Sequence, residues 1–253
     1  MQGTLMRYIT LILVLIIAGC EKYEPPKNEV VTKPSISYEE ALKGEAFTSI
    51  AREIGAKLTE EDRAIMKTAN ETLAMELKNP GLFAGDKAPN FNLSNAFGET
   101  VSLSSALENG PVILVFYRAA WCPFCNVHLK VLQDNLPEFK KYNAQLLTVT
   151  PQQPDKSVEQ LEKGNYDFEV LSDLDYQVMK DFNMYFELPK DVVNIYQRVG
   201  INLDEYNGQG RVGLPVPGTF IIDQTGTIRA VHAETDYSMR MEPADILKEL
   251  AKI

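Results

Sequence analysis

Apolar and polar positions follow two different periods along the chain. Between residues 38 and 77 the apolar positions recur every three to four residues, which predicts amphipathic helices. From about residue 82 short apolar runs alternate with helical patterns instead. Continuous apolar runs predict strands that are buried on both faces; these runs lie at 112–117, 145–149 and 168–171.

Further patterns complete one α/β unit. Apolar segments on either side of turn-forming residues predict two β-hairpins, at 91–103 and 220–231. Helical spacing indicates one helix at 127–139 and another at 243–252, which starts with a proline suited to a first turn. This order of elements predicts an α/β fold for residues 82–253, with a central mixed β-sheet flanked by helices.

Residues 38–80 precede this domain and carry no visible chemistry. Thr59 and Asp62 form the pattern of a capping box before the longest helical stretch. We expect an N-terminal helical extension here, an amphipathic hairpin packed on the main domain. An arm that interacts with another molecule is the alternative.

The first residues resemble an export signal. Arg7 is followed by an apolar stretch at 8–17, which is shorter than the roughly 20 residues that a membrane-spanning helix needs. The small residues that follow lead to Cys20, a pattern that resembles the lipobox of bacterial lipoproteins. The resemblance implies a cleaved lipoprotein signal peptide at 1–19 and a lipid on Cys20. An ordinary signal peptide with an incidental cysteine is the alternative.

Residues 20–37 combine three prolines with charged residues, so we expect a flexible tether between lipid and domain. A lipid on Cys20 would anchor the protein to a membrane and place it outside the cytoplasm, on the periplasmic side if the cell has two membranes. In such a compartment disulfides persist unless something reduces them.

Composition narrows the possible functions. A formal net charge of -10 argues against nucleic acid as a partner, because binding phosphates needs a clustered basic surface. The three cysteines are too few for a disulfide scaffold. If Cys20 carries lipid, Cys122 and Cys125 are the two thiols that remain.

Cys122 and Cys125 form a Cys-x-x-Cys pair where a buried strand is expected to end and a helix to begin. A helix N-terminus lowers the pKa of a cysteine, and the thiolate is the form that attacks disulfides and peroxides. Pro123 fits the first helical turn, where its missing N–H is harmless. We expect Cys122 to be the attacking, more exposed sulfur, and Cys125 to resolve it by forming a redox disulfide.

The same pair could instead supply half of a zinc site, which needs two further ligands. Besides carboxylates, the chain offers only His128 and His232. We therefore expect neither a metal nor a cofactor, and a metal-binding chaperone stays as an alternative. For His232, a structural role is the simpler expectation.

A second element points to the same site. Val216 and Pro217 precede the strand expected at 220–223. They resemble the proline element of thioredoxin-like proteins, which faces the dithiol and offers backbone groups to a bound peptide. The resemblance implies that both residues line the site.

Three separated motifs resemble the peroxiredoxin-like branch of the alkyl hydroperoxide reductase/thiol-specific antioxidant family. They are FAGDKAPNF at 83–91, FYRAAWCPFCN at 116–126 and DYSMRMEP at 236–243. The resemblance covers residues 82–253 and implies a thioredoxin-like fold with thiol-based antioxidant activity. It places Cys122 in the peroxidatic position, and implies that a thioredoxin-like donor reduces the Cys122–Cys125 disulfide after each hydroperoxide is consumed.

The chain departs from this family's pattern at two positions. Ala119 stands where such enzymes have Thr or Ser, and Pro217 stands where they have Arg before the strand. Arg118 could replace the missing cation and stabilise the thiolate, or be a solvated charge at the strand end. Trp121 could shield the dithiol, contact a partner or simply pack.

The departures favour a different activity, an extracytoplasmic oxidoreductase that exchanges disulfides with other proteins. The motifs as a whole favour the peroxidase. In the third motif, Asp236, Tyr237 and Arg240 have no chemistry that we can assign from sequence, so a surface salt bridge near the last helix is the expectation.

Overall fold

The computed structural model describes residues 34–253. The predicted signal peptide, the lipidation of Cys20 and most of the predicted tether lie outside the described residues. Within the part that is described, no helix is both long and apolar enough to cross a membrane.

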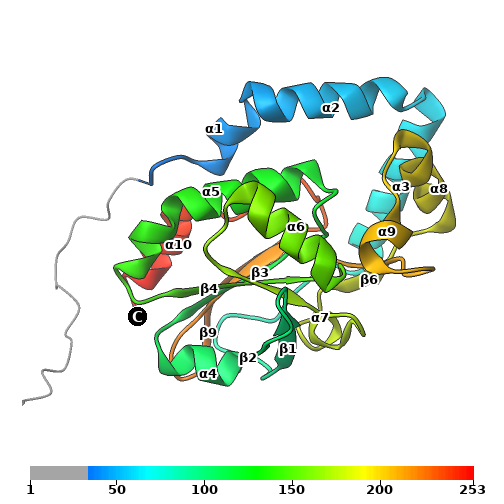
Figure 1. Ribbon diagram of the computed structural model, residues 1–253. Helices are drawn as coiled ribbons and strands as arrows, with labels where there is room; N and C mark the ends of the chain where they lie inside the picture. The colour runs from blue at the N-terminus through cyan, green and yellow to red at the C-terminus, as the bar shows by residue number, and fades with distance from the viewer. Residues whose placement is uncertain (1–33) are drawn as a thin grey trace, which may run out of the picture.

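One seven-stranded mixed sheet forms the centre of the domain, in the order β2-β1-β5-β4-β3-β8-β9 (Figure 1). β4 runs parallel to both β3 and β5, and the other neighbouring pairs are antiparallel. The strands are β1 Asn92–Asn95, β2 Thr100–Ser102, β3 Val112–Phe116, β4 Gln145–Thr150, β5 Glu169–Ser172, β8 Gly218–Ile222 and β9 Ile228–Ala233. The predicted mixed sheet and both predicted hairpins are confirmed.

Helices cover both faces of the sheet (Figure 1). Ile113 and Val115 of β3 pack toward Leu132 of α5 (Pro123–Lys140) and Ile246 of α10 (Pro243–Leu250). The other face of β3 packs toward α4 (Leu103–Glu108) and α7 (Gln177–Asp181). All five residues of β3 are buried, as its continuous apolar run predicts.

Between β4 and β8 the chain adds elements that were not predicted from the sequence. These are α6 Pro154–Gly164, β6 Tyr185–Glu187, α8 Lys190–Val199, α9 Leu203–Asn207 and β7 Gly213–Pro215. β6 and β7 pair antiparallel as a separate two-stranded sheet. Strands of three residues hold too few positions to display a period of two, which is why sequence reasoning missed them.

The extension consists of three helices, α1 Tyr38–Leu42, α2 Glu45–Lys57 and α3 Glu60–Glu76, and not of the expected hairpin. Figure 1 shows α1 and α2 above α5, while α3 turns down beside α8. The Thr59–Asp62 capping box is confirmed, since each side chain hydrogen bonds to the other's backbone N–H. Asp62 is also ion-paired with Arg198 of α8, which holds α3 on the domain.

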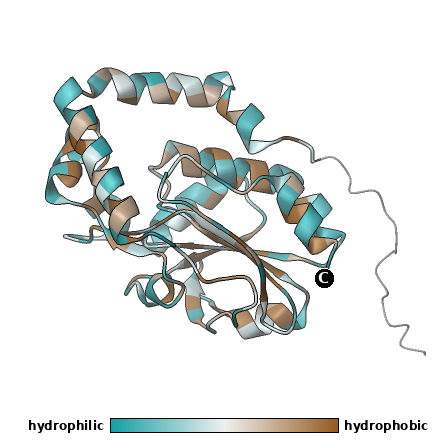
Figure 2. Ribbon diagram, turned by 180° about the vertical axis from the view of Figure 1, so that it is seen from behind, coloured by the Kyte–Doolittle hydropathy of each residue, from teal (hydrophilic) through white to brown (hydrophobic). Residues whose placement is uncertain are grey.

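α2 is the most weakly packed part of this extension. None of its residues is buried, whereas α1 buries Tyr38 and α3 buries Asp62. In Figure 2 the hydrophobic colour is concentrated on the central strands, while α2 carries hydrophilic and hydrophobic residues along its whole length. α2 is therefore a bridge between two anchored helices.

The last residues of the predicted tether contact the domain. Ser35 donates a hydrogen bond from its N–H to Asn135 Oδ1 at 3.0 Å, and Asn135 donates one to the Ile36 carbonyl at 3.1 Å. The chain is thus held against α5 before α1 begins.

Candidate active site

The Cys-x-x-Cys pair lies at the start of α5, just after β3. Cys122 is the N-cap residue, and its Sγ accepts a hydrogen bond from the Cys125 N–H at 3.4 Å. Pro123 is in the first turn, where no N–H is needed. Both thiols are free, with the two sulfurs 2.7 Å apart. A disulfide needs about 2.05 Å, so the pair can join with little movement.

Arg118 lies directly against Cys122. Its Nη2 donates to Cys122 Sγ at 3.4 Å, and its Nη1 donates to the Tyr196 hydroxyl at 3.1 Å. The guanidinium lies over the rings of Trp121 and Tyr237, with centroid distances of 5.1 and 4.4 Å. Only 5% of Arg118 is exposed, so it is a buried cation at the site and not a solvated charge at the strand end.

Arg240 is the second cation of the site, and the expectation of a surface salt bridge is wrong. It is 6% exposed, and its Nη2 donates to Cys125 Sγ at 3.3 Å. Its Nη1 donates to the backbone carbonyls of Tyr237 and Met239. The motif around Arg240 was visible in the sequence, but nothing local indicates that it meets a cysteine 115 positions earlier.

These contacts give the two thiols different pKa values. Burial raises the pKa of Cys122, but the hydrogen bond from Cys125 and the charges of Arg118 and Arg240 outweigh it, so that pKa lies well below the usual range. Burial and the neighbouring Cys122 sulfur raise the pKa of Cys125 well above the usual range, despite both arginines. Cys122 is therefore the thiolate and Cys125 holds the proton.

Both sulfurs are completely buried, which contradicts the expectation that Cys122 is the more exposed one. Phe124, between the two cysteines, packs against Tyr237 at a centroid distance of 5.7 Å. It also packs against Phe47 of α2 at 4.9 Å. The extension thus covers the dithiol, which sequence reasoning could not foresee because residues 38–80 carry no local sign of where they dock.

Side-chain amides hold the loop between β3 and α5 in place through hydrogen bonds. The Ala120 N–H donates to Gln152 Oε1 at 2.9 Å, and Asn126 Nδ2 donates to the Ala120 carbonyl at 2.7 Å. Gln160 Nε2 donates in turn to Asn126 Oδ1 at 2.9 Å. These buried or half-buried residues, which sequence reasoning missed, hold the segment that carries Arg118 and Trp121.

Val216 and Pro217 are buried and line a pocket together with Arg118. The Val216 N–H donates to the Met184 carbonyl at 2.7 Å, so it is not free for a bound peptide. Ala119 is buried and has no hydroxyl to offer a peroxide. Trp121 is 8% exposed and packs edge-on against Tyr196.

Both histidines have lowered pKa values. His128 is buried against the Tyr38 ring, and desolvation lowers its pKa well below the usual range. Burial also lowers the pKa of His232. Among residues 34–253 no three side chains of the metal-binding types lie together as a candidate metal site.

A dithiol at the N-terminus of the helix that follows the central strand, in a mixed α/β sheet, defines a protein of the thioredoxin-like class. Residues 84–231 match the AhpC/TSA family, and this span is more than half of the chain. The chain belongs to this family, in its peroxiredoxin-like branch, and is a thiol-dependent oxidoreductase.

Named relatives agree with this assignment. Peroxiredoxin Bcp of Escherichia coli (strain K12) is 38% identical over 109 residues, which cover 43% of this chain and 69% of the relative. A putative peroxiredoxin of Haemophilus influenzae is 31% identical over 153 residues, covering 60% of this chain and 86% of the relative.

Solved structures confirm the thioredoxin-like fold. Peroxidoxin BcpB from Mycobacterium tuberculosis superposes with a TM-score of 0.54 at 24% identity, over 69% of this chain and 99% of the other. A peroxiredoxin-like protein from Aquifex aeolicus superposes with the same TM-score at 15% identity, over 69% of this chain and 89% of the other. The extension at 38–80 precedes the region that matches the family.

Proposed function

We propose that this chain is a peroxiredoxin-like thiol peroxidase that reduces hydroperoxides through a Cys122–Cys125 dithiol cycle. The observation that carries the proposal is the unequal environment of the two sulfurs. Arg118 donates to Cys122 and lowers its pKa, while Cys125 keeps its proton beside it. A peroxidase needs this combination of a ready nucleophile and a nearby resolving thiol.

The reaction follows from the two sulfurs. The Cys122 thiolate attacks the outer oxygen of the hydroperoxide, the O–O bond breaks, and the other oxygen leaves with a proton as an alcohol or water. Cys122 is then a sulfenic acid. Cys125 loses its proton and attacks that sulfur, the S–S bond forms and water leaves. A dithiol donor of the thioredoxin type reduces the disulfide and is itself oxidised to a disulfide.

The two arginines take the place of the peroxide-orienting groups that the family pattern places elsewhere. Arg118 has a buried Nε with no hydrogen-bond partner among the described residues. This donor belongs to the guanidinium that contacts the Cys122 sulfur, next to which a leaving oxygen gains negative charge during the reaction. Donors that are already in position stabilise such charge without reorganising.

Disulfide exchange with other proteins is the second candidate. It is favoured by Ala119 and Pro217, which supply neither the hydroxyl nor the guanidinium that the family pattern expects. The hydrogen bond of the Val216 N–H to Met184 weighs against it, because that N–H would otherwise pair with a peptide.

Stopped-flow oxidation of the reduced protein tests the proposal. Trp121 is the single tryptophan and lies next to Cys122, so its fluorescence should report the oxidation. We expect hydroperoxides to oxidise Cys122 at least about a hundredfold faster than a free thiol, the lower end of what a pre-positioned donor contributes. A free-thiol rate, together with fast reduction of a protein disulfide, would support the second candidate instead.

Two substitutions assign the roles of the cysteines. Cys122→Ser should abolish oxidation by hydroperoxide altogether. Cys125→Ser should leave one round of oxidation, with a sulfenic acid on Cys122 visible by mass spectrometry after trapping, but should abolish turnover with a thioredoxin-like donor. Turnover by Cys122→Ser would show that the nucleophile is misassigned.

We also propose that the protein is a lipoprotein held outside the cytoplasm. The support is the apolar stretch that ends at Cys20 and the charged, proline-containing segment after it. Mass spectrometry of the membrane-extracted protein should find Cys20 as an acylated first residue. Cys20→Ser should release the protein from the membrane fraction, and an unmodified N-terminus in the native protein would disprove the anchor.

A further inference from the structure

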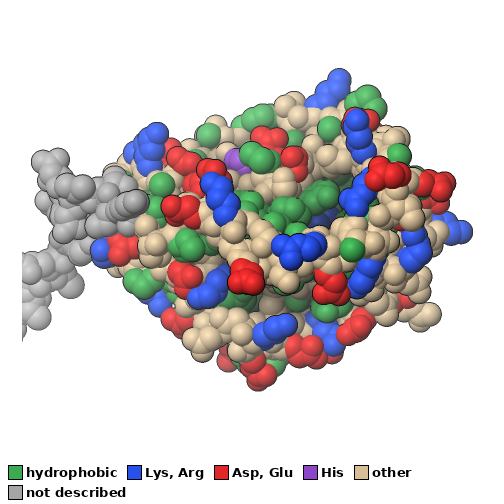
Figure 3. Space-filling view, turned by 90° about the horizontal axis from the view of Figure 1, so that it is seen from above, with side chains coloured by type: hydrophobic (Ala, Val, Ile, Leu, Met, Phe, Trp, Pro, Cys, Tyr) green, Lys and Arg blue, Asp and Glu red, His purple; other side chains and the backbone are tan. Residues whose placement is uncertain are grey.

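Arg240 is held in one position by contacts at both terminal nitrogens of its guanidinium. Nη1 donates to the backbone carbonyls of Tyr237 and Met239, and Nη2 donates to Cys125 Sγ at 3.3 Å. On the face of the molecule seen from above, the visible charged side chains lie at the surface around an apolar hollow (Figure 3). Arg240 differs from these, since it is a fixed and buried cation in contact with the resolving sulfur.

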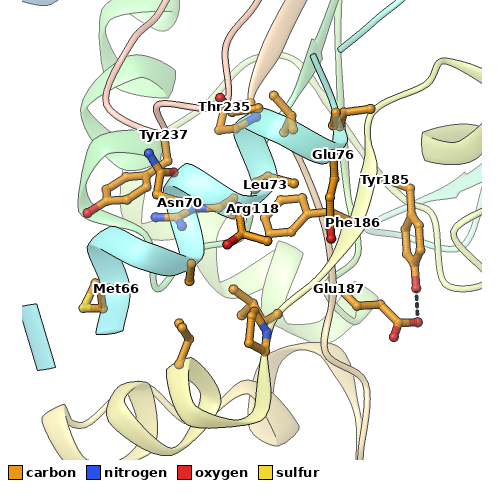
Figure 4. Close-up of a pocket in the computed structure, with 18 of the residues that line it drawn as sticks. Met66, Asn70, Leu73, Glu76, Arg118, Tyr185, Phe186, Glu187, Thr235 and Tyr237 are labelled. Carbon is orange, nitrogen blue, oxygen red and sulfur yellow. Dashed lines mark hydrogen bonds between the residues drawn. The ribbon is translucent and has the colours of Figure 1, made fainter. Parts of the chain in front are cut away.

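The two arginines of the site border different spaces. Arg118 lines a cavity of about 390 Å³ between α3 and the domain, where Figure 4 shows it near Tyr237. It also lines a second cavity of about 230 Å³ beneath α2. Arg240 lines neither of these cavities. Arg118 therefore links the cavities to Cys122, whereas Arg240 meets Cys125 without bordering either of them.

The N-terminal extension fixes the segment that carries Arg240. The Tyr38 hydroxyl donates to the Ser238 carbonyl at 2.8 Å, and the Tyr38 N–H donates to Glu242 at 2.7 Å. These two bonds lie on either side of Arg240 along the chain, and its guanidinium is 5.9 Å from the centroid of the Tyr38 ring. Tyr38 and Arg240 both lie outside residues 84–231, the part of the chain that matches the family.

Oxidation of Cys122 changes the charge beside Cys125. In the reduced protein, burial and the Cys122 sulfur raise the pKa of Cys125, while Arg240 and Arg118 oppose this rise. Cys122 is a neutral sulfenic acid once it has reacted with a peroxide. The repulsion between two negative sulfurs then disappears, but both arginines remain. The charge of Arg240 therefore acts on Cys125 most effectively in the oxidised intermediate.

The histidines and tyrosines around Cys125 and Arg240 carry no charge at neutral pH. Burial lowers the pKa of each histidine and raises that of each tyrosine; these residues are His128 of α5, His232 of β9, Tyr38 of α1 and Tyr117 after β3. The carboxylate of Glu242 accepts hydrogen bonds from two backbone N–H groups of α1. The charges that act on Cys125 are thus mainly those of Cys122 and the two arginines.

We propose that Arg240 is a catalytic residue of the resolving step and that Tyr38 positions it. Nη2 of Arg240 stabilises the negative charge that develops on Cys125 Sγ as this sulfur attacks the sulfenic acid of Cys122. The S–S bond forms, the S–O bond breaks, and the proton of Cys125 ends on the departing oxygen, which leaves as water. A donor that is already in place stabilises such charge without reorganising. The inference rests on the peroxidase function proposed above and assigns a residue to its second step.

The first test needs no peroxide. In Cys122→Ser the neighbour of Cys125 is a neutral hydroxyl, which stands in for the neutral sulfenic acid. The pKa of Cys125, followed through the ultraviolet absorbance of its thiolate against pH, should be higher when Arg240→Gln is added, because the thiolate loses a positive charge. Gln keeps N–H donors for the backbone carbonyls, and Arg240→Lys, which keeps the charge, should raise the pKa less.

Arg229→Gln is the matched control for this titration. Arg229 is also ion-paired, with Asp223, but its side chain is 47% exposed and contacts neither sulfur. The pKa of Cys125 should stay where it is in Cys122→Ser when Arg229→Gln is added. An equal pKa with and without Arg240→Gln would overturn the proposal.

The second test separates the two steps of one turnover. The reduced protein receives one equivalent of hydrogen peroxide, and mass spectrometry follows the trapped sulfenic acid and the disulfide with time. Arg240→Gln should lower the ratio of the resolving rate to the oxidation rate by about a hundredfold, the effect of removing one pre-positioned donor. The ratio is the quantity to compare, because Arg240 also lowers the pKa of Cys122 and its loss slows oxidation as well.

Slow resolution has a second signature, since a further peroxide converts the waiting sulfenic acid to a sulfinic acid. Arg240→Gln should accumulate this product on Cys122 at peroxide concentrations that leave the native chain active. Tyr38→Phe keeps the ring but loses the bond to Ser238, so it should shift the ratio and the sulfinic acid in the same direction by a smaller factor. If Arg240→Gln does not fold, a native ratio in Tyr38→Phe overturns the proposal.

The outcomes separate this proposal from the peroxidase function. If no hydroperoxide oxidises Cys122 faster than a free thiol, the peroxidase function fails and the resolving step fails with it. If oxidation is fast but the native chain and Arg240→Gln have the same ratio of rates, the peroxidase stands and only the role of Arg240 is overturned.

Discussion

Two arginines from distant parts of the chain contact the two sulfurs of the dithiol. Arg118 belongs to the loop just before Cys122, and Arg240 lies shortly before α10. Each is almost fully buried, so its charge acts through a medium that screens it less than water does. The charges of the pair lower the pKa of Cys122, which explains how a buried cysteine keeps its thiolate.

Removing Arg118 should raise the pKa of Cys122, because the thiolate loses both a positive charge and a hydrogen bond. In the native chain the oxidation rate should stay high well below the ordinary thiol range and fall as the pH drops through the lowered pKa. Arg118→Met should move this fall to higher pH. Arg118→Lys, which keeps the charge, should move it less.

The rate of alkylation of Cys122 by iodoacetamide, followed against pH in the Cys125→Ser background, measures this midpoint. A midpoint that stays in place in Arg118→Met would show that Arg118 does not set the thiolate.

At the scale of elements, α2 crosses above the N-terminus of α5. Its contact with the dithiol segment is Phe47 against Phe124, and none of its own residues is buried. α1 and α3 hold the ends of the bridge, through Tyr38 with Glu242 and through Asp62 with Arg198. A helix with so little buried surface can move away from the domain at a low free-energy cost. Such a movement would let a protein reductant reach the dithiol.

Phe47→Ala should open this cover and speed the alkylation of Cys122. An aromatic pair of this kind contributes about 0.5–1.5 kcal/mol, which corresponds to about a two- to tenfold faster reaction. Ile50→Ala is the matched control, because Ile50 lies on α2 but is 48% exposed and lines neither cavity. Equal alkylation rates in the native chain and in Phe47→Ala would show that α2 does not limit access.

At the scale of the whole molecule, the central sheet holds the dithiol loop and the proline element in place. β3 delivers the loop to Cys122, and β8 begins next to Pro217 and pairs with β3 along its whole length. Phe220 of β8 packs on Phe116 and Phe182, with centroid distances of 5.7 and 5.3 Å. This aromatic cluster ties the strand that carries the dithiol to the strand that follows the proline element.

Phe220→Ala should therefore lower the free energy of unfolding by about 3–5 kcal/mol, because a large buried ring leaves a cavity. Phe97→Ala should change it by less than about 0.5 kcal/mol, since Phe97 is 70% exposed. Urea unfolding followed by circular dichroism measures both. A loss below about 1 kcal/mol for Phe220→Ala would mean that the core closes around the missing ring.

The hydrophobic pattern by itself determined the mixed sheet, both hairpins, α5 and α10, because long periodic or continuous apolar segments specify their own element. The spacing of Cys122 and Cys125 at a strand–helix junction identified the dithiol, since one helical turn brings the two sulfurs together wherever the helix docks.

Only the tertiary structure decided what surrounds those sulfurs. Arg240 and Phe47 reach the site from segments whose local sequence does not show where they dock. Arg240 meets a cysteine 115 positions earlier, and Phe47 depends on the packing of α2 over α5. The exposure of Cys122 was misjudged for the same reason. Local sequence can place a reactive group on an element, but burial is set by every other element that packs against it.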